Sequence, residues 1–176
     1  MTWPAYLVLA LVTLQRLGEL LLAERNTRRL LAKGAHEVAR GHYPYMVAVH
    51  AGWLAALWLL GPGPPIHVIP LIVYAALQVV RVWVIATLGE RWTTRIIVLP
   101  GAPPVRSGPY RWLRHPNYAV VIAEIAVLPL AFGAVAIAFA FSAANLVLVA
   151  RRIRIEDAAL AVQPDPLPIG GEAGQA

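Results

Sequence analysis

Long apolar runs constrain this chain more than any other feature. They cover residues 5–22, 46–60, 68–88, 119–132 and 134–150. A helix needs about 20 apolar residues, or about 17 if short, to cross the hydrocarbon layer of a membrane. Of the 176 residues, 59% are hydrophobic and only 14% are charged, so one soluble core cannot bury this apolar surface. The sequence therefore predicts an all-α integral membrane bundle of about five transmembrane helices.

The last two apolar runs are short and are separated only by Gly133. They form either a helical hairpin or one long bent segment, and Pro129 and Gly133 favour the hairpin. We expect one membrane domain over residues 1–160. Residues 161–176 are rich in proline and glycine without apolar periodicity, which predicts a disordered tail.

Positive charge is distributed unevenly among the connecting segments. Five lysines and arginines lie between the first and second runs, five between the third and fourth, and three follow the last. The positive-inside rule then predicts an N-terminus outside and a C-terminus in the cytoplasm. The net charge of +6 reflects this topology and contact with anionic membrane lipids, so nucleic acid is not an expected partner. The first run carries Arg16 and Glu19 without a cleavage pattern, so we interpret it as a span and not a signal peptide.

Several classes of site are excluded by residue type. The chain has no cysteine, so disulfides, iron–sulfur clusters and thiolate nucleophiles are impossible. None of the five histidines has the spacing of a metal-binding motif, and we predict no metal site. Phosphate-binding loops, dinucleotide fingerprints and the GxSxG motif are also missing from the sequence.

Four ionisable residues fall within or near the predicted spans, where burial is costly without a partner. Arg16 and Glu19 are three residues apart and share a helix face, so they either neutralise each other or serve function. Arg81 is either a partner for Glu19 or Glu124, or an anchor for a substrate anion. Glu124 is either that partner or a group that orients a substrate hydroxyl.

The string RHPNY, at residues 114–118, lies at the start of the fourth run. Pro116 suits the first turn of a helix, and the free amides there attract anions. Arg111 and Arg114 add positive charge, while Tyr110 and Tyr118 offer hydroxyls and flat faces to a ring or a sulfonium. The alternative is an ordinary interfacial belt of aromatic and basic residues.

Glu156 and Asp157 lie in the segment RRIRIEDAAL, which looks like an amphipathic continuation of the last helix into the cytoplasm. They are either a solvated helix end or the acidic wall of a pocket whose cationic wall is formed by RHPNY. A pocket with both walls would suit a zwitterion.

Together these motifs resemble the isoprenylcysteine carboxyl methyltransferase family, and a bacterial subgroup associated with type III polyketide synthases. The likeness runs from about residue 15 to residue 160. It includes the WTTRIIVLPG segment at residues 92–101 and the following motif residues: Gly108, Pro109, Tyr110, Arg114, His115, Pro116, Tyr118, Arg152, Ile153, Glu156 and Asp157.

The resemblance implies a membrane methyltransferase in the bacterial inner membrane that uses S-adenosylmethionine from the cytoplasm and a lipophilic acceptor from the bilayer. A type III polyketide synthase is an expected partner. The implied cofactor-binding residues are Val105, Gly108, Tyr110, Arg114, His115, Pro116, Tyr118, Glu156 and Asp157.

Methyl transfer from a sulfonium requires an acceptor oxygen about 3 Å from the methyl carbon, in line with the sulfur. Arg81 could clamp an acceptor anion, and Glu124 or His50 could serve as base for a phenol. We expect a long-chain alkylresorcinol or alkylpyrone hydroxyl as acceptor, because the tail lacks the aromatic segment usual in prenylcysteine enzymes. The alternatives are carboxyl methylation of a prenylcysteine, an NADPH-dependent membrane reductase and a membrane scaffold.

Overall fold

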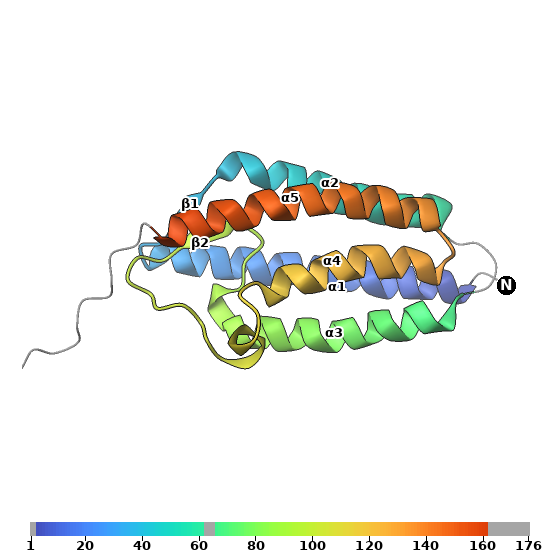
Figure 1. Cartoon of the computed structure of the whole chain (residues 1–176), viewed down its shortest axis with the longest axis horizontal. Coiled ribbons are helices and arrows are strands. Elements are labelled where there is room, and N and C mark those ends of the chain that lie inside the picture. Colours follow the sequence, from blue (N-terminus) through green and yellow to red (C-terminus); the bar gives the residue numbers. More distant parts are fainter. Residues whose placement is uncertain (1–2, 62–65, 162–176) are drawn as a thin grey trace, which may run out of the picture.

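Five helices form the bundle in the computed structural model, which describes residues 3–61 and 66–161. They lie side by side along one axis (Figure 1). Their bounds are α1 Trp3–Ala32, α2 Tyr43–Leu60, α3 Val68–Leu88, α4 Pro116–Ala131 and α5 Val135–Ala161. The all-α prediction is confirmed. Residues 162–176 of the predicted tail lie outside the described residues.

Four of these helices are long and apolar enough to cross a membrane, namely α1, α2, α3 and α5. The fifth, α4, has 16 residues. The first helix extends ten residues beyond the predicted span, through turns that combine exposed charged residues such as Arg25 and Arg28 with buried residues such as Asn26 and Leu30. There Arg28 pairs with Glu24 one turn earlier, at 2.9 Å.

A tight turn joins α4 to α5, as predicted for the last two apolar runs. Gly133 has a φ of +69°, a conformation that glycine adopts without penalty. The amide of Ala134 donates to the carbonyl of Pro129 at 2.9 Å and closes the turn. The hairpin prediction is therefore confirmed.

The long polar segments gather at one end of the bundle, opposite the end where α1 begins (Figure 1). There two short strands, β1 His36–Val38 and β2 Ile96–Val98, pair antiparallel with His36 opposite Val98. The segments also contain three single turns of 3-10 helix: η1 Arg40–His42, η2 Gly89–Arg91 and η3 Gly108–Arg111.

Asn26 ties α1 to this end of the bundle. Its buried amide donates to the carbonyls of Gly89 at 3.1 Å and Trp92 at 2.8 Å. The apolar core lies toward the opposite end, where Trp53 packs with Leu57 and Leu128, all almost fully buried. The polar end of the bundle is thus held together by hydrogen bonds and strand pairing, and the other end by apolar packing.

Candidate functional site

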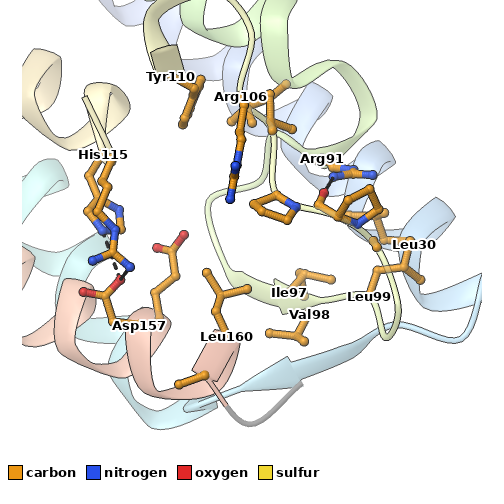
Figure 2. Close-up of a pocket in the computed structure, with 18 of the residues that line it drawn as sticks. Leu30, Arg91, Ile97, Val98, Leu99, Arg106, Tyr110, His115, Asp157 and Leu160 are labelled. Carbon is orange, nitrogen blue, oxygen red and sulfur yellow. Dashed lines mark hydrogen bonds and ion pairs between the residues drawn. The ribbon is translucent and has the colours of Figure 1, made fainter. Parts of the chain in front are cut away.

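A cavity of about 900 Å³ opens at the polar end of the bundle. Its walls come from the ends of α1, α3 and α5, from β2, and from the loop between β2 and α4 (Figure 2). The volume lies in the usual range of small-molecule sites. The charged lining residues are Arg91, Arg106, Arg111, Arg114, Glu156 and Asp157, and His115 lines the cavity beside them. The apolar walls include Leu30, Leu88, Ile97, Val98 and Leu160.

His115 and Asp157 form one wall of this cavity. The Nε2 atom of His115 lies 3.2 Å from the Oδ1 atom of Asp157, and a guanidinium nitrogen of Arg114 lies 3.6 Å from the same oxygen. His115 immediately precedes α4, and Asp157 lies in the last turns of α5. The α4–α5 hairpin therefore brings together two motifs that are about 40 residues apart in sequence.

Tyr118 links the second acidic residue to the body of the protein. Its hydroxyl donates to Glu156 and accepts a hydrogen bond from Nε of Arg152 at 2.8 Å. Arg152 is buried and also donates to the carbonyl of Thr94 at 2.7 Å. The ring of Tyr118 stacks on His115, with 5.4 Å between centroids. The orientation of Glu156 is thus fixed by a chain of contacts from α4, α5 and the segment before β2.

A smaller pocket of about 100 Å³ shares part of these walls and reaches toward Asn117, Tyr118 and Arg152. Tyr110 lines both cavities. Burial raises the pKa of the Tyr110 phenol above its usual range, and the nearby Glu156 carboxylate raises it further. Tyr110 therefore keeps its proton at neutral pH and can donate a hydrogen bond to a ligand.

Six of the nine predicted cofactor residues line the large cavity: Val105, Tyr110, Arg114, His115, Glu156 and Asp157. Tyr118 lines the smaller pocket. The other two shape the backbone around the cavities. Pro116 begins α4, as expected, and Gly108 begins η3 with a φ of +53°.

We expect Gly108→Ala to destabilise the protein by about 1–2 kcal/mol through backbone strain alone, and by more through a clash. A Cβ at residue 108 would lie 2.4 Å from Oγ1 of Thr87, on α3. Thermal unfolding in detergent would measure the loss. The double variant Gly108→Ala with Thr87→Ala should recover the clash component only.

The matched control is Gly34→Ala, where φ is +88° but no atom lies within 4 Å of the added Cβ. This variant should show the strain component alone. Equal losses at both glycines would contradict the packing role of Gly108.

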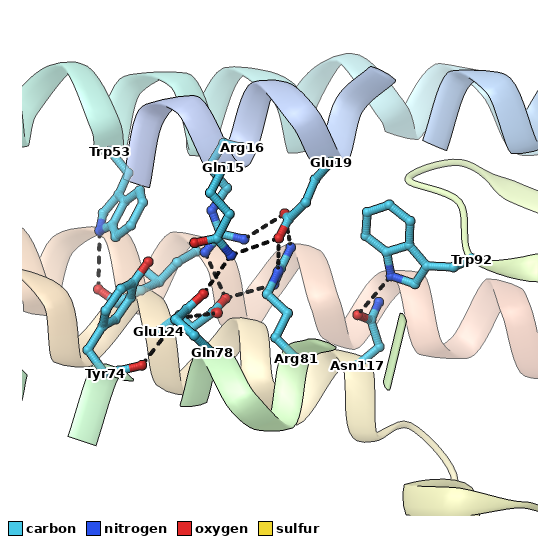
Figure 3. A network of polar contacts seen from close by, with 11 residues as sticks. Gln15, Arg16, Glu19, Trp53, Tyr74, Gln78, Arg81, Trp92, Asn117 and Glu124 are labelled. Carbon is cyan, nitrogen blue, oxygen red and sulfur yellow. Dashed lines mark hydrogen bonds and ion pairs between the residues drawn. The ribbon is translucent and has the colours of Figure 1, made fainter. Parts of the chain in front are cut away.

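A second polar cluster lies deeper in the bundle (Figure 3). Arg81 donates to both oxygens of Glu19 at 2.5 Å and to Glu124 at 2.7 Å. Arg16 pairs with the same two carboxylates, at 3.0 and 2.9 Å. Gln78 donates to the remaining oxygen of Glu124 at 2.8 Å. Two cations and two anions thus form a neutral network that joins α1, α3 and α4.

The ion pairs expected among these residues are present in the network. Arg16 does pair with Glu19, and Arg81 is a partner of both glutamates. Glu124 lies six residues after Tyr118 on α4, which is a rise of about 9 Å along the helix. The network therefore lies deeper in the bundle than the contact between Tyr118 and Glu156. None of its four charged members is among the lining residues of the two cavities.

His50 lies on α2 with its Nδ1 atom 2.8 Å from the carbonyl oxygen of Met46. It is close enough to Arg16, Arg81 and Glu124 to interact with their charges. The structure thus places the three predicted catalytic residues, Arg81, Glu124 and His50, in one region of the bundle. Within the described ranges, no group of three or more potential ligand side chains is arranged to hold a metal ion.

Four arginines of the site are missing from the predicted cofactor-binding residues, namely Arg91, Arg106, Arg111 and Arg152. Arg152 supports Tyr118, and Arg106 lines the large cavity. A signal for Arg152 existed, because it lies four residues before Glu156 and therefore on the same helix face. For Arg106 the sequence gave no such signal, because this residue is one of several arginines in a segment without a predicted helix or strand.

The family model described as "Isoprenylcysteine carboxyl methyltransferase (ICMT) family" matches residues 68–162. An uncharacterised protein of Bacillus subtilis (strain 168), YpbQ, is 38% identical over 160 residues, which cover 88% of this chain and 95% of the relative. No solved structure matches significantly.

Proposed function

Because the chain belongs to the isoprenylcysteine carboxyl methyltransferase family, we propose that it moves a methyl group from S-adenosylmethionine to an oxygen of a lipophilic acceptor. Family membership supports a membrane methyltransferase. We propose in addition which cofactor and acceptor it uses and which residues bind them.

One observation carries the proposed cofactor site. His115 and Tyr118 from the start of α4 contact Asp157 and Glu156 from the end of α5, beside a cavity large enough for a nucleoside. The carboxylates of Glu156 and Asp157 can bind the ammonium group or the ribose hydroxyls of the cofactor. The arginines that line the cavity supply the positive charge that the carboxylate of the cofactor needs. A zwitterionic cofactor needs both. When bound, S-adenosylmethionine would supply an electrophilic methyl group next to its sulfonium.

Water must be kept from the sulfonium while the acceptor oxygen is held in line with it. The apolar walls of the cavity, Leu30, Leu88 and Leu160, are suited to exclude water. The smaller pocket shares walls with this cavity and is also lined by Asn117 and Tyr118 of α4 and Arg152 of α5. We propose that the acceptor head group enters from the bilayer on this side, with the cavity facing the bacterial cytoplasm and the N-terminus outside.

We propose Arg81 as the residue that holds an anionic acceptor, with Glu124 or His50 as base if the acceptor is a phenol. The network supplies these ionisable groups within the membrane. It also gives Arg81 two carboxylate partners, so an acceptor anion must displace one of them. A carboxylate acceptor needs no base, and it only has to replace one of the two glutamates that pair with Arg81.

Two acceptor classes fit this site. A long-chain alkylresorcinol or alkylpyrone, supplied by a type III polyketide synthase, would be methylated on a hydroxyl. A prenylcysteine would be methylated on its carboxylate, and the description of the matching family names this chemistry.

Transfer of labelled methyl from S-adenosylmethionine by the purified protein in detergent separates the two acceptor classes. The panel holds an alkylresorcinol, an alkylpyrone and a farnesylcysteine analogue. Label in the first two identifies a polyketide O-methyltransferase, and label in the third identifies a carboxyl methyltransferase. A protein that labels none of them, at any acceptor concentration, would contradict both proposals for the acceptor.

A further inference from the structure

The large cavity carries more positive than negative charge. Four arginines and two carboxylates line it. S-adenosylmethionine has one carboxylate, which needs a cation of its own. We propose that Arg106 binds the carboxylate of S-adenosylmethionine and thereby sets the orientation of the cofactor. This inference rests on the proposed function.

The other three arginines already have partners. Arg91 donates to the carbonyl of Pro103 at 2.5 Å, and Arg114 pairs with Asp157 at 3.6 Å. The guanidinium of Arg111 lies over the ring of Trp112, 5.1 Å from its centroid. For Arg106 the structure records no hydrogen bond or ion pair with any residue in the described ranges. Among the four lining arginines, Arg106 is therefore the one with no hydrogen bond, ion pair or ring contact to a described residue.

Position supports the same assignment. The side chain of Arg106 points from its loop into the cavity, while His115 and Asp157 lie on another wall (Figure 2). The carboxylate and the ammonium of S-adenosylmethionine are on the same carbon atom, so a carboxylate at Arg106 keeps the ammonium close to it and leaves the acidic wall to the ribose hydroxyls. Different partners at the two walls define one orientation for the elongated cofactor and disfavour the reverse one.

The loop that carries Arg106 is stiffened by its sequence. Pro103 and Pro104 fix φ at two successive positions, and the hydrogen bond from Arg91 to Pro103 anchors the same stretch to η2, which follows α3. A guanidinium presented from a restrained backbone loses less entropy when it binds a carboxylate. Its planar donors also match a carboxylate in a two-point contact, which the ammonium of lysine does not.

Binding of S-adenosylmethionine and decarboxylated S-adenosylmethionine to the purified full-length protein tests this inference. The two ligands differ only in the carboxylate. The wild-type protein should prefer S-adenosylmethionine, and Arg106→Ala should weaken its binding by about 10- to 100-fold, as expected for one lost charge-assisted pair. The same substitution should change the Kd of the decarboxylated ligand by no more than about twofold, because that ligand has no carboxylate for Arg106 to bind.

Arg28→Ala is the matched control for loss of an arginine charge. Arg28 is exposed on α1 and does not line the cavity, so binding of both ligands should stay the same. Equal weakening of both ligands by Arg106→Ala, or no weakening of either, would overturn the role of Arg106 alone. Failure of the wild-type protein to bind either ligand would overturn the proposed function as well.

Discussion

Glu124→Leu should lower the free energy of unfolding by about 3–5 kcal/mol, the cost of leaving a buried charge without its partner. Glu124 is only 1% exposed and accepts hydrogen bonds from Arg16, Arg81 and Gln78. Without its carboxylate, two buried guanidinium groups share the single charge of Glu19. Reversible unfolding in mixed detergent micelles would measure the loss.

The double variant Arg16→Leu with Glu124→Leu provides the sharper test of this network. It removes one cation and one anion and leaves the two-point pair between Arg81 and Glu19 intact. If charge balance is what matters, the double variant should be more stable than Glu124→Leu alone. The exposed Glu24→Leu variant is the control, because its pair with Arg28 lies in solvent and contributes little. A double variant less stable than the single one would contradict the charge-balance account.

Glu156→Ala should weaken binding of S-adenosylhomocysteine by about 10- to 100-fold and reduce methyl transfer accordingly. The substitution removes a carboxylate that lines the cavity and accepts a hydrogen bond from Tyr118. Equilibrium binding to the purified protein would measure the affinity, and a thermal unfolding curve would show that the fold is retained.

Tyr118→Phe serves as the companion variant. It breaks the hydrogen bonds to Glu156 and Arg152 but leaves the carboxylate in the cavity wall. Its loss of affinity should be smaller than that of Glu156→Ala, because Tyr118 only positions the group that we propose touches the cofactor. The reverse order of the two losses would contradict the assignment of Glu156 as the contact residue.

Much of the fold could be predicted from local sequence. Apolar runs of sufficient length predicted the helices, and Gly133 after Pro129 predicted the hairpin, since both signals act over one or two turns. The predicted span at residues 5–22 lies within α1, and the ten further residues of this helix were not predicted because they are not an apolar run. The sheet of β1 and β2 was not predicted, because three-residue strands gain stability only from a partner 60 residues away.

Some contacts of the candidate site could likewise be predicted from the sequence, and others could not. The expected partners of Arg81 were two distant glutamates, and the structure contains both pairs because a buried charge leaves few options. The contacts of Arg152 with Tyr118 and Thr94 depend on how α5 lies against α4 and the segment before β2, which local sequence does not specify. The orientation of Arg106 into the cavity depends likewise on the path of a loop without regular structure.

Saturable binding of S-adenosylhomocysteine to the purified protein, measured in competition with NADPH, tests the central claim most directly. The account predicts one site per chain that His115→Ala weakens and that excess NADPH does not occupy. Since four arginines line the cavity, NADPH is the informative competitor, because its phosphates would also seek them. Displacement of the labelled ligand by NADPH at lower concentration than by S-adenosylmethionine, or no saturable binding at all, would contradict a methyltransferase.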